Sequence, residues 1–398
     1  MFERLEPVVP DSILGLMAAY RADPDPRKVD LGIGVYRDEH GDTPVPASVR
    51  QAESALIARQ TTKSYIGPAG NPAFNQALEQ LVLGAKHPAL TSGRVRTVQS
   101  PGGCGALRLG AELIRAASPE SVVHVSTPTW ANHTPLLAGS GLRLERYPYL
   151  DAATGKVQFA AMMESLERLP ARAVVLLHAS CHNPTGADLM QSQWRELLAL
   201  ISRRGLLPFV DMAYQGLGDG LDEDAFGLRL LGAELPEMLC AVSCSKNFGV
   251  YRERTGALHF IGSSPAAADA ALSQLVRLAR GIWSMPPDHG AAIVQAVLGD
   301  PSLRAQWTEE VTAMRSRIRG LRREVVEHLR QHCPQRDFSF IREQRGMFSF
   351  LGIDTSQVRK LRERHHVYMT DDSRMNMAGL RRGNLEYFAR AVAEVLKA

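Results

Sequence analysis

The sequence has few cysteines, and no two of them form a C-x-x-C pair. The five cysteines are scattered and odd in number, which argues against a disulfide framework and against a metal site of the zinc type. No stretch approaches the roughly 18 apolar residues of a membrane span, and the acidic N-terminus lacks the apolar core of a secretory signal. We therefore predict a protein of the reducing cytoplasm with no bound metal and no membrane partner.

The phosphate-binding signatures of nucleotide enzymes are also missing. The chain contains no GK[ST] of a Walker loop and no G-x-G-x-x-G fingerprint with an acid about 20 residues further on. A nicotinamide-dependent dehydrogenase is therefore a poor alternative. The net charge of +4 is small for 398 residues, and the basic residues are interleaved with acids. This distribution does not indicate a nucleic-acid partner.

Lysine is scarce, because only seven of the 46 basic residues are lysines and the rest are arginines. Few lysines therefore compete for a covalent role. The apolar share of 45% and the charged share of 22% are typical of a globular enzyme. The length exceeds that of a single hydrophobic core and predicts two domains.

Between about residues 95 and 262, short apolar runs alternate with helical patterns such as 106–117 and 193–203. Several runs are apolar throughout, as is typical of strands that are buried on both faces. The alternation predicts an α/β fold with a mostly parallel central sheet and helices on both faces. The expected strands are 95–99, 121–126, 173–178, 206–210, 239–243 and 256–261.

The pattern changes after Met285, where two consecutive prolines break the chain. A long helix is expected over 301–330, followed by a shorter α+β pattern with helices near 357–365 and 384–396. The N-terminal stretch is too short and too rich in proline to form a domain, so it should pack on the second domain or on a partner subunit. We predict an N-terminal arm with part of the small domain over 1–43, a large domain over 44–313 and a small C-terminal domain over 314–398.

A polar turn after an expected buried strand carries a single lysine, Lys246, in the sequence Ser-Cys-Ser-Lys-Asn-Phe-Gly. A lone lysine is by default a surface residue. Here Ser243, Ser245 and Arg254 supply the donors that a phosphate needs near an amine that forms an imine. The turn therefore predicts Lys246 as a reactive amine beside a bound phosphate.

A glycine-rich turn, Pro101 to Gly105, precedes the helix expected over 106–117. Backbone N–H groups can approach a phosphate at such a turn, and the helix N-terminus adds a positive dipole. Glycine-rich turns also occur for tight packing, so this one does not decide the matter alone.

Two further polar segments, Cys-His-Asn-Pro-Thr-Gly from Cys181 and Asp-Met-Ala-Tyr from Asp211, follow apolar strands. Both should lie at the carboxyl ends of strands, where open α/β sheets bind ligands. Asp211 could serve only as a helix N-cap. Its functional interpretation is that the carboxylate keeps a ring nitrogen protonated, because a protonated pyridine is the better electron sink.

Taken in order, the motifs PGGxGALR, CHNPTG, DxAYQG, SxSKxFGxYxxRxG and SRxNxAG resemble the class I aminotransferases. The similarity is greatest to the branch of aspartate and aromatic-amino-acid aminotransferases, and it extends from Leu31 to Gly379. The ordered set is more specific than any single motif. It implies the type I fold of enzymes that use pyridoxal 5'-phosphate, with 44–313 as the cofactor-binding domain.

The resemblance implies a role for the polar residues around the cofactor ring. Lys246 would carry the cofactor as an imine and later move the proton between the substrate's α-carbon and the cofactor. Asp211 would hold the pyridinium nitrogen, with His133 behind it; a structural histidine is the alternative for His133. Asn183 and Tyr214 would hydrogen-bond the phenolic oxygen of the ring and so tune the pKa of the imine.

The resemblance also implies a set of phosphate ligands, one of which the other subunit of a homodimer would supply. Aspartate enzymes of the family usually carry threonine where this chain has Cys104, and a thiol is a weaker hydrogen-bond donor than a hydroxyl. The departure puts the side-chain contact in doubt but leaves the backbone contacts. The implied ligands are Gly103, Cys104, Ser243, Ser245 and Arg254, with Tyr65 from the partner.

Substrate recognition requires a planar group that binds the α-carboxylate, and Arg374 in Ser-Arg-Met-Asn matches the arginine that the family uses. Arg280 matches the arginine that reaches across the dimer to a side-chain carboxylate, so dicarboxylates such as aspartate and 2-oxoglutarate are expected substrates. The remaining implied contacts are Gly34 through its backbone, Trp130 stacked on the ring, Asn183, and Phe348 as a pocket wall.

Three positions near the expected substrate site, Met285, Trp283 and Cys104, differ from the aspartate enzymes and reduce polarity there. We therefore predict transamination between an aromatic amino acid, with aspartate also accepted, and 2-oxoglutarate. The alternative is an aspartate aminotransferase with minor aromatic activity. Decarboxylation or β-elimination on the same fold is a further alternative. A non-catalytic role would require that a catalytic residue be missing, and none of the catalytic residues implied by the resemblance is missing.

Overall fold

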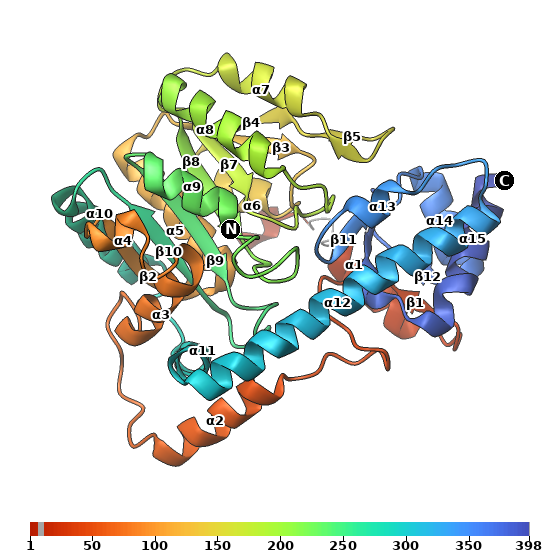
Figure 1. Cartoon of the computed structure of the whole chain (residues 1–398), viewed down its shortest axis with the longest axis horizontal. Coiled ribbons are helices and arrows are strands. Elements are labelled where there is room, and N and C mark those ends of the chain that lie inside the picture. Colours follow the sequence, from red (N-terminus) through yellow and green to blue (C-terminus); the bar gives the residue numbers. More distant parts are fainter. Residues whose placement is uncertain (7–11, 398) are drawn as a thin grey trace.

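A seven-stranded sheet lies at the centre of the larger part of the molecule (Figure 1). The structure is a computed structural model that describes residues 1–6 and 12–397. All neighbouring strands are parallel except at β10, which runs antiparallel to both of its neighbours. In spatial order the strands are β2 (Val95–Pro101), β10 (Thr255–Ile261), β9 (Met238–Ser243), β8 (Leu207–Met212), β7 (Val174–His178), β3 (Val122–Thr127) and β4 (Arg143–Pro148).

The six strands that the sequence predicts are all present, within one or two residues at most of their ends. The seventh, β4, was not predicted. Its sequence, Arg-Leu-Glu-Arg-Tyr-Pro, is charged at three of six positions, and the same three residues are exposed. β4 is an edge strand with a neighbour on one side only, and charged side chains are typical of such strands. It therefore lacks the continuous apolar run by which the other strands were recognised.

Helices cover both faces of the sheet, as predicted. Alternate residues of β7 show this directly, because Val174 and Leu176 belong to one apolar core and Val175 and Leu177 to the other. The first core is closed by α5 (Gly102–Ala117), α6 (His133–Ala138) and α10 (Pro265–Ile282). The second is closed by helices that include α3 (Pro72–Leu83), α8 (Gln191–Arg204), α9 (Phe226–Glu234) and α11 (His289–Gly299).

The long helix α12 (Pro301–His332) connects this sheet to the C-terminal part of the chain (Figure 1). One end packs against α2 and α11, and the other packs against α13 and α15. The predicted boundary between 313 and 314 therefore falls inside a continuous helix, and the division into domains stays a prediction. The C-terminal helices are α13 (Phe340–Glu343), α14 (Thr355–His365) and α15 (Leu385–Lys397).

The N-terminal stretch packs on the C-terminal part of the chain, one of the two places expected for it. The strand β1 (Val29–Asp30) pairs in parallel with β12 (Val367–Tyr368), while β11 (Phe348–Phe350) pairs in antiparallel fashion with β13 (Arg374–Asn376). Within the described residues, no helix combines the length and apolar character needed to span a membrane. The remaining elements are α1 (Ser12–Ala22), α2 (Ala47–Arg59), α4 (Pro88–Thr91), α7 (Phe159–Glu167), β5 (Leu150–Asp151), β6 (Lys156–Val157) and short 3-10 turns at Phe2–Arg4, Met377–Gly379 and Arg382–Asn384.

Trp307 joins α12 to the turn that follows β9. Its indole is fully buried and stacks on Phe248, with ring centroids 4.4 Å apart and the planes 9° from parallel. Its Nε1 donates a hydrogen bond of 2.8 Å to the carbonyl of Asn247. The residue next to Asn247 in the chain is Lys246, so α12 fixes the position of this lysine.

We expect Trp307→Ala to lower the free energy of unfolding by roughly 3–5 kcal/mol, because it leaves a large cavity. Trp307→Phe should keep the stacking but leave the Asn247 carbonyl without its donor, at a cost of about 1–3 kcal/mol. Urea denaturation followed by circular dichroism measures both. Glu309→Ala, at an exposed position of the same helix, is the control and should stay within about 0.5 kcal/mol. A Trp307→Ala protein that unfolds at the midpoint of this control would contradict the assignment.

Candidate active site

A cavity of about 150 Å³ lies at the carboxyl ends of β8 and β9, next to the N-terminus of α5. Most of the side chains that the sequence singled out for the cofactor line it together. A larger open groove of about 720 Å³, between β6 and α12, shares no lining residue with it. The cavity is lined by Gly103, Cys104, Leu107, Trp130, Asn183, Asp211, Ala213, Tyr214, Ser243, Ser245, Lys246 and Arg254; of these, Leu107 and Ala213 were not predicted.

Lys246 enters this cavity from the turn after β9. Its Nζ lies 4.9 Å from the centroid of the Tyr214 ring. Burial lowers the pKa of Lys246, the negative charge of Asp211 opposes that change, and the net pKa is below its ordinary value. A larger share of neutral amine makes this lysine a better nucleophile and proton acceptor than a surface lysine.

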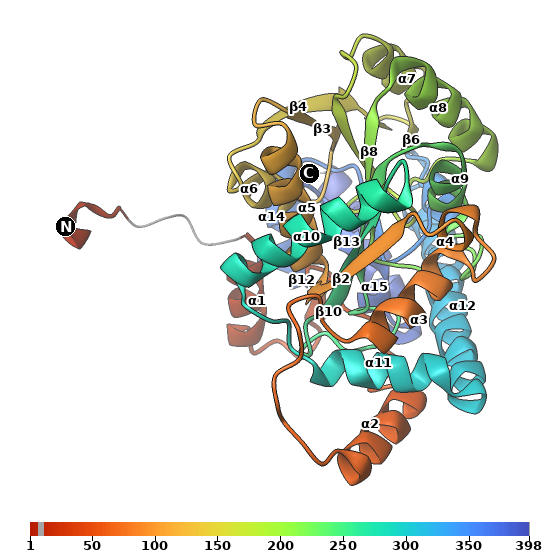
Figure 2. The ribbon, with the colours of Figure 1, turned by 90° about the vertical axis from the view of Figure 1, so that its left-hand side faces the viewer.

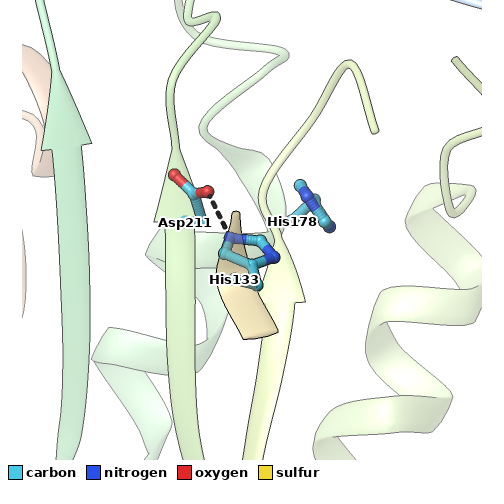
Figure 3. Close-up of side chains that lie close together, drawn as sticks. All are labelled: His133, His178 and Asp211. Atoms are coloured by element: carbon cyan, nitrogen blue, oxygen red, sulfur yellow. Dashed lines mark hydrogen bonds and ion pairs between the residues drawn. The ribbon is translucent and has the colours of Figure 1, made fainter. Parts of the chain in front are cut away.

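Asp211 lies near the end of β8 and faces the same cavity. Its Oδ2 is hydrogen-bonded to Nε2 of His133 at 3.0 Å (Figure 3), and Nδ1 of His133 is 2.8 Å from the hydroxyl of Thr129. Burial raises the pKa of Asp211, but the hydrogen bond and the charge of His133 outweigh it, so that the pKa is lowered overall. The carboxylate therefore stays ionised and can pair with a protonated ring nitrogen. Thr129 was not predicted, since nothing in the sequence distinguishes it from other threonines after strands.

A second histidine, His178, lies on the far side of His133 (Figure 3). The two ring centroids are 5.2 Å apart, and the ring of His182 follows at 4.1 Å from that of His178. Burial, followed by the charge of His133, lowers the pKa of His178 to about 3. His178 was part of an expected strand but was not predicted to lie behind the site.

A phosphate can be accommodated where the turn after β9 meets the first turn of α5. The hydroxyl of Ser243 donates to that of Ser245 at 3.1 Å, and Arg254 Nη1 lies 3.5 Å from the same Ser245 oxygen. Gly102 has φ +69°, and a Cβ there would lie 2.7 Å from Arg254 Nη2, so glycine leaves this space open. Because α5 begins at Gly102 rather than at residue 106, the N–H group of Gly103 lies in its unpaired first turn.

Cys104 lies beside this space, in the same first turn of α5. Its sulfur is 3.9 Å from the amide nitrogen of Asn132, at the limit of a hydrogen bond that ends on sulfur. Cys104 is among the residues that line the cavity, and the contact of its thiol with a phosphate stays a prediction.

Asn183 and Tyr214 both line the cavity and contact each other. The amide nitrogen of Asn183 donates to the Tyr214 hydroxyl at 3.3 Å. The amide oxygen of Asn183 is buried and has no hydrogen-bond partner among the described residues. A polar atom left unsatisfied in this way is costly, and a polar ligand group in the cavity would relieve that cost. Together with the phosphate space and Asp211, it fits the cofactor that the resemblance implies.

The group expected to bind a carboxylate is linked through Phe348 to Tyr214, which lines this cavity. Arg374 on β13 is buried, donates to the carbonyl of Gly32 at 2.8 Å, and lies with its Cζ 4.6 Å above the ring of Phe348. The Phe348 ring in turn meets Tyr214 edge-on at 6.0 Å. A Cβ on Gly34 would lie 2.8 Å from this ring, so only glycine allows the N-terminal loop so close.

Six predicted residues are not among those that line this cavity. The contacts given above link four of them, His133, Gly34, Phe348 and Arg374, to its lining residues, and the other two are Tyr65 and Arg280. The side chain of Tyr65 is 91% exposed, in the loop between α2 and α3. Arg280 is exposed near the end of α10 and hydrogen-bonds the hydroxyl of Ser284. Figure 2 shows α2 and the loop that follows it at the outer end of the molecule.

Comparisons with known proteins give a consistent result over the whole chain. The family described as aminotransferase class I and II matches residues 26–392. The aromatic-amino-acid aminotransferase of Pseudomonas aeruginosa is 48% identical over 394 residues, covering 99% of this chain and 98% of that protein. The aspartate aminotransferase of Escherichia coli is 43% identical over 396 residues and all of both chains. The crystal structure of an aromatic-amino-acid aminotransferase from Burkholderia pseudomallei, covalently bound to pyridoxal phosphate, superposes with a TM-score of 0.97 at 42% identity, covering 100% of this chain and 99% of that one.

We expect His178 to make the protein less stable as the pH falls from about 6.5 to about 5. In the folded protein its pKa of about 3 keeps it neutral, whereas in the unfolded chain it binds a proton below about pH 6.5. The unfolded state therefore binds more protons, and each such histidine costs up to about 1.4 kcal/mol per pH unit. His178→Asn should reduce the loss of unfolding free energy over this range by about 1 kcal/mol per pH unit.

Urea denaturation at several pH values measures this change. His40→Asn, at an exposed position, serves as the control and should follow the wild-type curve. Parallel curves for the wild type and His178→Asn would show that His178 is not held neutral.

Proposed function

Because the chain belongs to the class I and II aminotransferases, we propose that it transfers the amino group of aromatic L-amino acids, and also of aspartate, to 2-oxoglutarate. The products are the corresponding 2-oxo acid and L-glutamate. The observation that carries this proposal is one small cavity in which an amine of lowered pKa, an ionised carboxylate and a space for phosphate lie together.

Pyridoxal 5'-phosphate is the cofactor, and the residues of the cavity provide for each of its parts. The phosphate would be held by Ser243, Ser245, Arg254 and the first turn of α5. When bound, the ring withdraws electrons from the substrate's α-carbon and so makes its proton easier to remove. The residues placed around the ring are Trp130, Asn183, Asp211 with His133 behind it, and Tyr214.

The chain's own groups supply binding, orientation and proton transfer. Lys246 moves the proton at the α-carbon, because it carries the only amine among the described residues that line the cavity. Asp211 stays ionised and keeps its ring partner protonated. Tyr214 and Asn183 share a hydrogen bond that holds both polar groups toward one side of the ring.

Arg374 binds the α-carboxylate that all substrates share. Its guanidinium is held between the Gly32 carbonyl and the face of Phe348, so little side-chain freedom is lost when a substrate binds. The preference for aromatic side chains rests on the reduced polarity at Met285 and Trp283 and on the relatives that are named for aromatic amino acids. Aspartate aminotransferase with minor aromatic activity remains the alternative, and relatives with that name support it.

We further propose a homodimer with shared active sites. Three exposed residues support this arrangement, because Tyr65 and Ile57 present large apolar surface at and after α2, and Arg280 does not line the candidate cofactor cavity of its own chain. A two-fold assembly would bring Tyr65 and Arg280 of one chain to the cavity of the other. The five free cysteines support a reducing, cytoplasmic location.

We expect borohydride reduction of the purified protein to fix a pyridoxyl group on Lys246, as located by mass spectrometry of peptides. L-Glutamate added before reduction should release 2-oxoglutarate in an amount equal to the cofactor, without release of carbon dioxide. Lys246→Ala should bind cofactor without the covalent bond and should show no turnover. Label on another residue, or full activity in Lys246→Ala, would refute the proposal; carbon dioxide without 2-oxoglutarate would indicate a decarboxylase.

We expect Arg280→Ala to reduce kcat/KM for aspartate and for 2-oxoglutarate by about a hundredfold or more, because a buried carboxylate loses its charged partner. Phenylalanine in the first half-reaction should be affected far less. Steady-state and single-turnover rates with these three substrates measure the difference. Arg277→Ala, at an exposed position one turn earlier in α10, is the matched control and should behave as the wild type.

A mixture of Lys246→Ala and Arg280→Ala proteins tests directly whether Arg280 of one subunit reaches the active site of the other. If Arg280 serves the partner's cavity, hybrid dimers contain one site with both residues intact. After subunit exchange, roughly a quarter of wild-type aspartate activity should return in an equimolar mixture. No recovery in a mixture shown to contain hybrid dimers would place Arg280 in its own chain's site or in none.

A further inference from the structure

A buried arginine of α12, Arg322, contacts the segment that carries Phe348 and has no role in the function proposed above. Its side chain is 1% exposed. Within residues 1–6 and 12–397, no side-chain carboxylate comes within 4.0 Å of its guanidinium. Burial lowers its pKa to about 9, so it is still charged at neutral pH. A buried cation is costly unless other groups compensate it.

The compensation comes from backbone carbonyls of one short segment. Nη1 of Arg322 donates to the carbonyl of Ile341 at 3.0 Å and to the hydroxyl of Ser349 at 2.6 Å. Nη2 donates to three further carbonyls, those of Arg345 at 3.2 Å, Gly346 at 2.9 Å and Phe348 at 2.6 Å. The planar guanidinium therefore gathers five acceptors that all lie between residues 341 and 349.

The same segment leads into the carboxylate site. Phe348 is the first residue of β11, which pairs with β13, and Arg374 is the first residue of β13. The ring of Phe348 lies directly beneath the Arg374 guanidinium, 4.6 Å from its Cζ. A shift of the Phe348 carbonyl would therefore move the surface on which Arg374 rests.

The segment is also held from the side of the large sheet. The N–H of Arg345 donates to the carbonyl of Gly186 at 2.7 Å. Gly186 has φ +70°, and a Cβ there would lie 2.3 Å from the Phe348 carbonyl oxygen. Gly186 ends the turn that carries Asn183. The hydrogen bonds of the Arg322 guanidinium connect α12 to the Phe348 segment, and the Phe348 segment is in turn bonded to the turn of Asn183.

We propose that Arg322 is a positioning residue for the α-carboxylate of the substrates, a role that rests on the proposed transamination. Arg322 does not touch the substrate. It fixes the carbonyl of Phe348, and through the ring of Phe348 it sets the height and tilt of the Arg374 guanidinium. The ligand class that depends on it is any carboxylate bound by Arg374, in amino acids and 2-oxo acids alike.

Lysine cannot replace Arg322 in this role. An ammonium has three donors around a point, whereas the guanidinium directs its donors in one plane toward acceptors on two sides. Arg322→Lys keeps the charge and nearly the size, so it tests the geometry with little other change. Arg323→Lys is the matched control, because Arg323 is the next residue of α12 and is exposed.

The experiment compares both holoenzymes with the wild type. It measures the dissociation constant of 3-phenylpropanoate, an unreactive carboxylate, from the change in cofactor absorbance, together with KM and kcat for phenylalanine, aspartate and 2-oxoglutarate. For Arg322→Lys we expect the dissociation constant and all KM values to rise about tenfold. The rise should exceed any fall in kcat, and the cofactor content by borohydride labelling should be unchanged. Arg323→Lys should match the wild type.

An Arg322→Lys protein that is folded, fully loaded with cofactor and unchanged in these constants overturns the proposal. If Arg322→Lys yields no folded protein, Ser349→Ala decides, because it removes one acceptor of the guanidinium and leaves the charge in place. A severalfold weaker binding of 3-phenylpropanoate by loaded Ser349→Ala supports the proposal, and wild-type binding overturns it. Failure of the proposed function is distinct, because there the wild type itself would carry no cofactor on Lys246.

Discussion

A carboxylate and an amine that face the same small cavity determine the chemistry of this protein. Burial alone would favour the neutral form of both groups, raising the pKa of Asp211 and lowering that of Lys246. The surroundings of the two groups change their pKa values in different ways. His133 and Thr129 hold Asp211 in its charged form, whereas Lys246 is left with a lowered pKa beside the ring of Tyr214. An ionised acid and a more readily neutral amine can therefore coexist a short distance apart.

The architecture follows from the need to place these two groups side by side. Neighbouring parallel strands, β8 and β9, both deliver polar residues at the same edge of the sheet, and α5 starts at that edge. This arrangement supplies the acid, the amine and a helix N-terminus without any long loop. The carboxylate-binding Arg374 comes from the other end of the chain, and it is brought to the cavity by the pairing of β11 with β13 and by its bond to Gly32.

Much of this could be predicted from the sequence, because buried parallel strands are continuous apolar runs and the polar turns after them are short. Asp211, Asn183 and Lys246 were therefore placed correctly at one edge. The charged edge strand β4 was missed because it has no apolar run. Arg322 was missed for a related reason. It lies within the buried stripe of α12, four residues after Ile318 and four before Val326, and an arginine at such a position could have been noticed. Four of its five acceptors are backbone carbonyls, which the sequence does not distinguish.

The unbroken course of α12 also limits how this chain can change in length. One end of the helix holds the lysine turn through Trp307, and further along it Arg322 holds the Phe348 segment. The two contacts are thus separated by a fixed number of helical residues. α12 therefore sets the distance between the turn that carries the cofactor lysine and the segment that supports the carboxylate-binding arginine. One inserted residue between them would rotate everything beyond it by about 100° and advance it by about 1.5 Å. Insertions can therefore be absorbed in the surface loops of this protein but not along this stretch of helix.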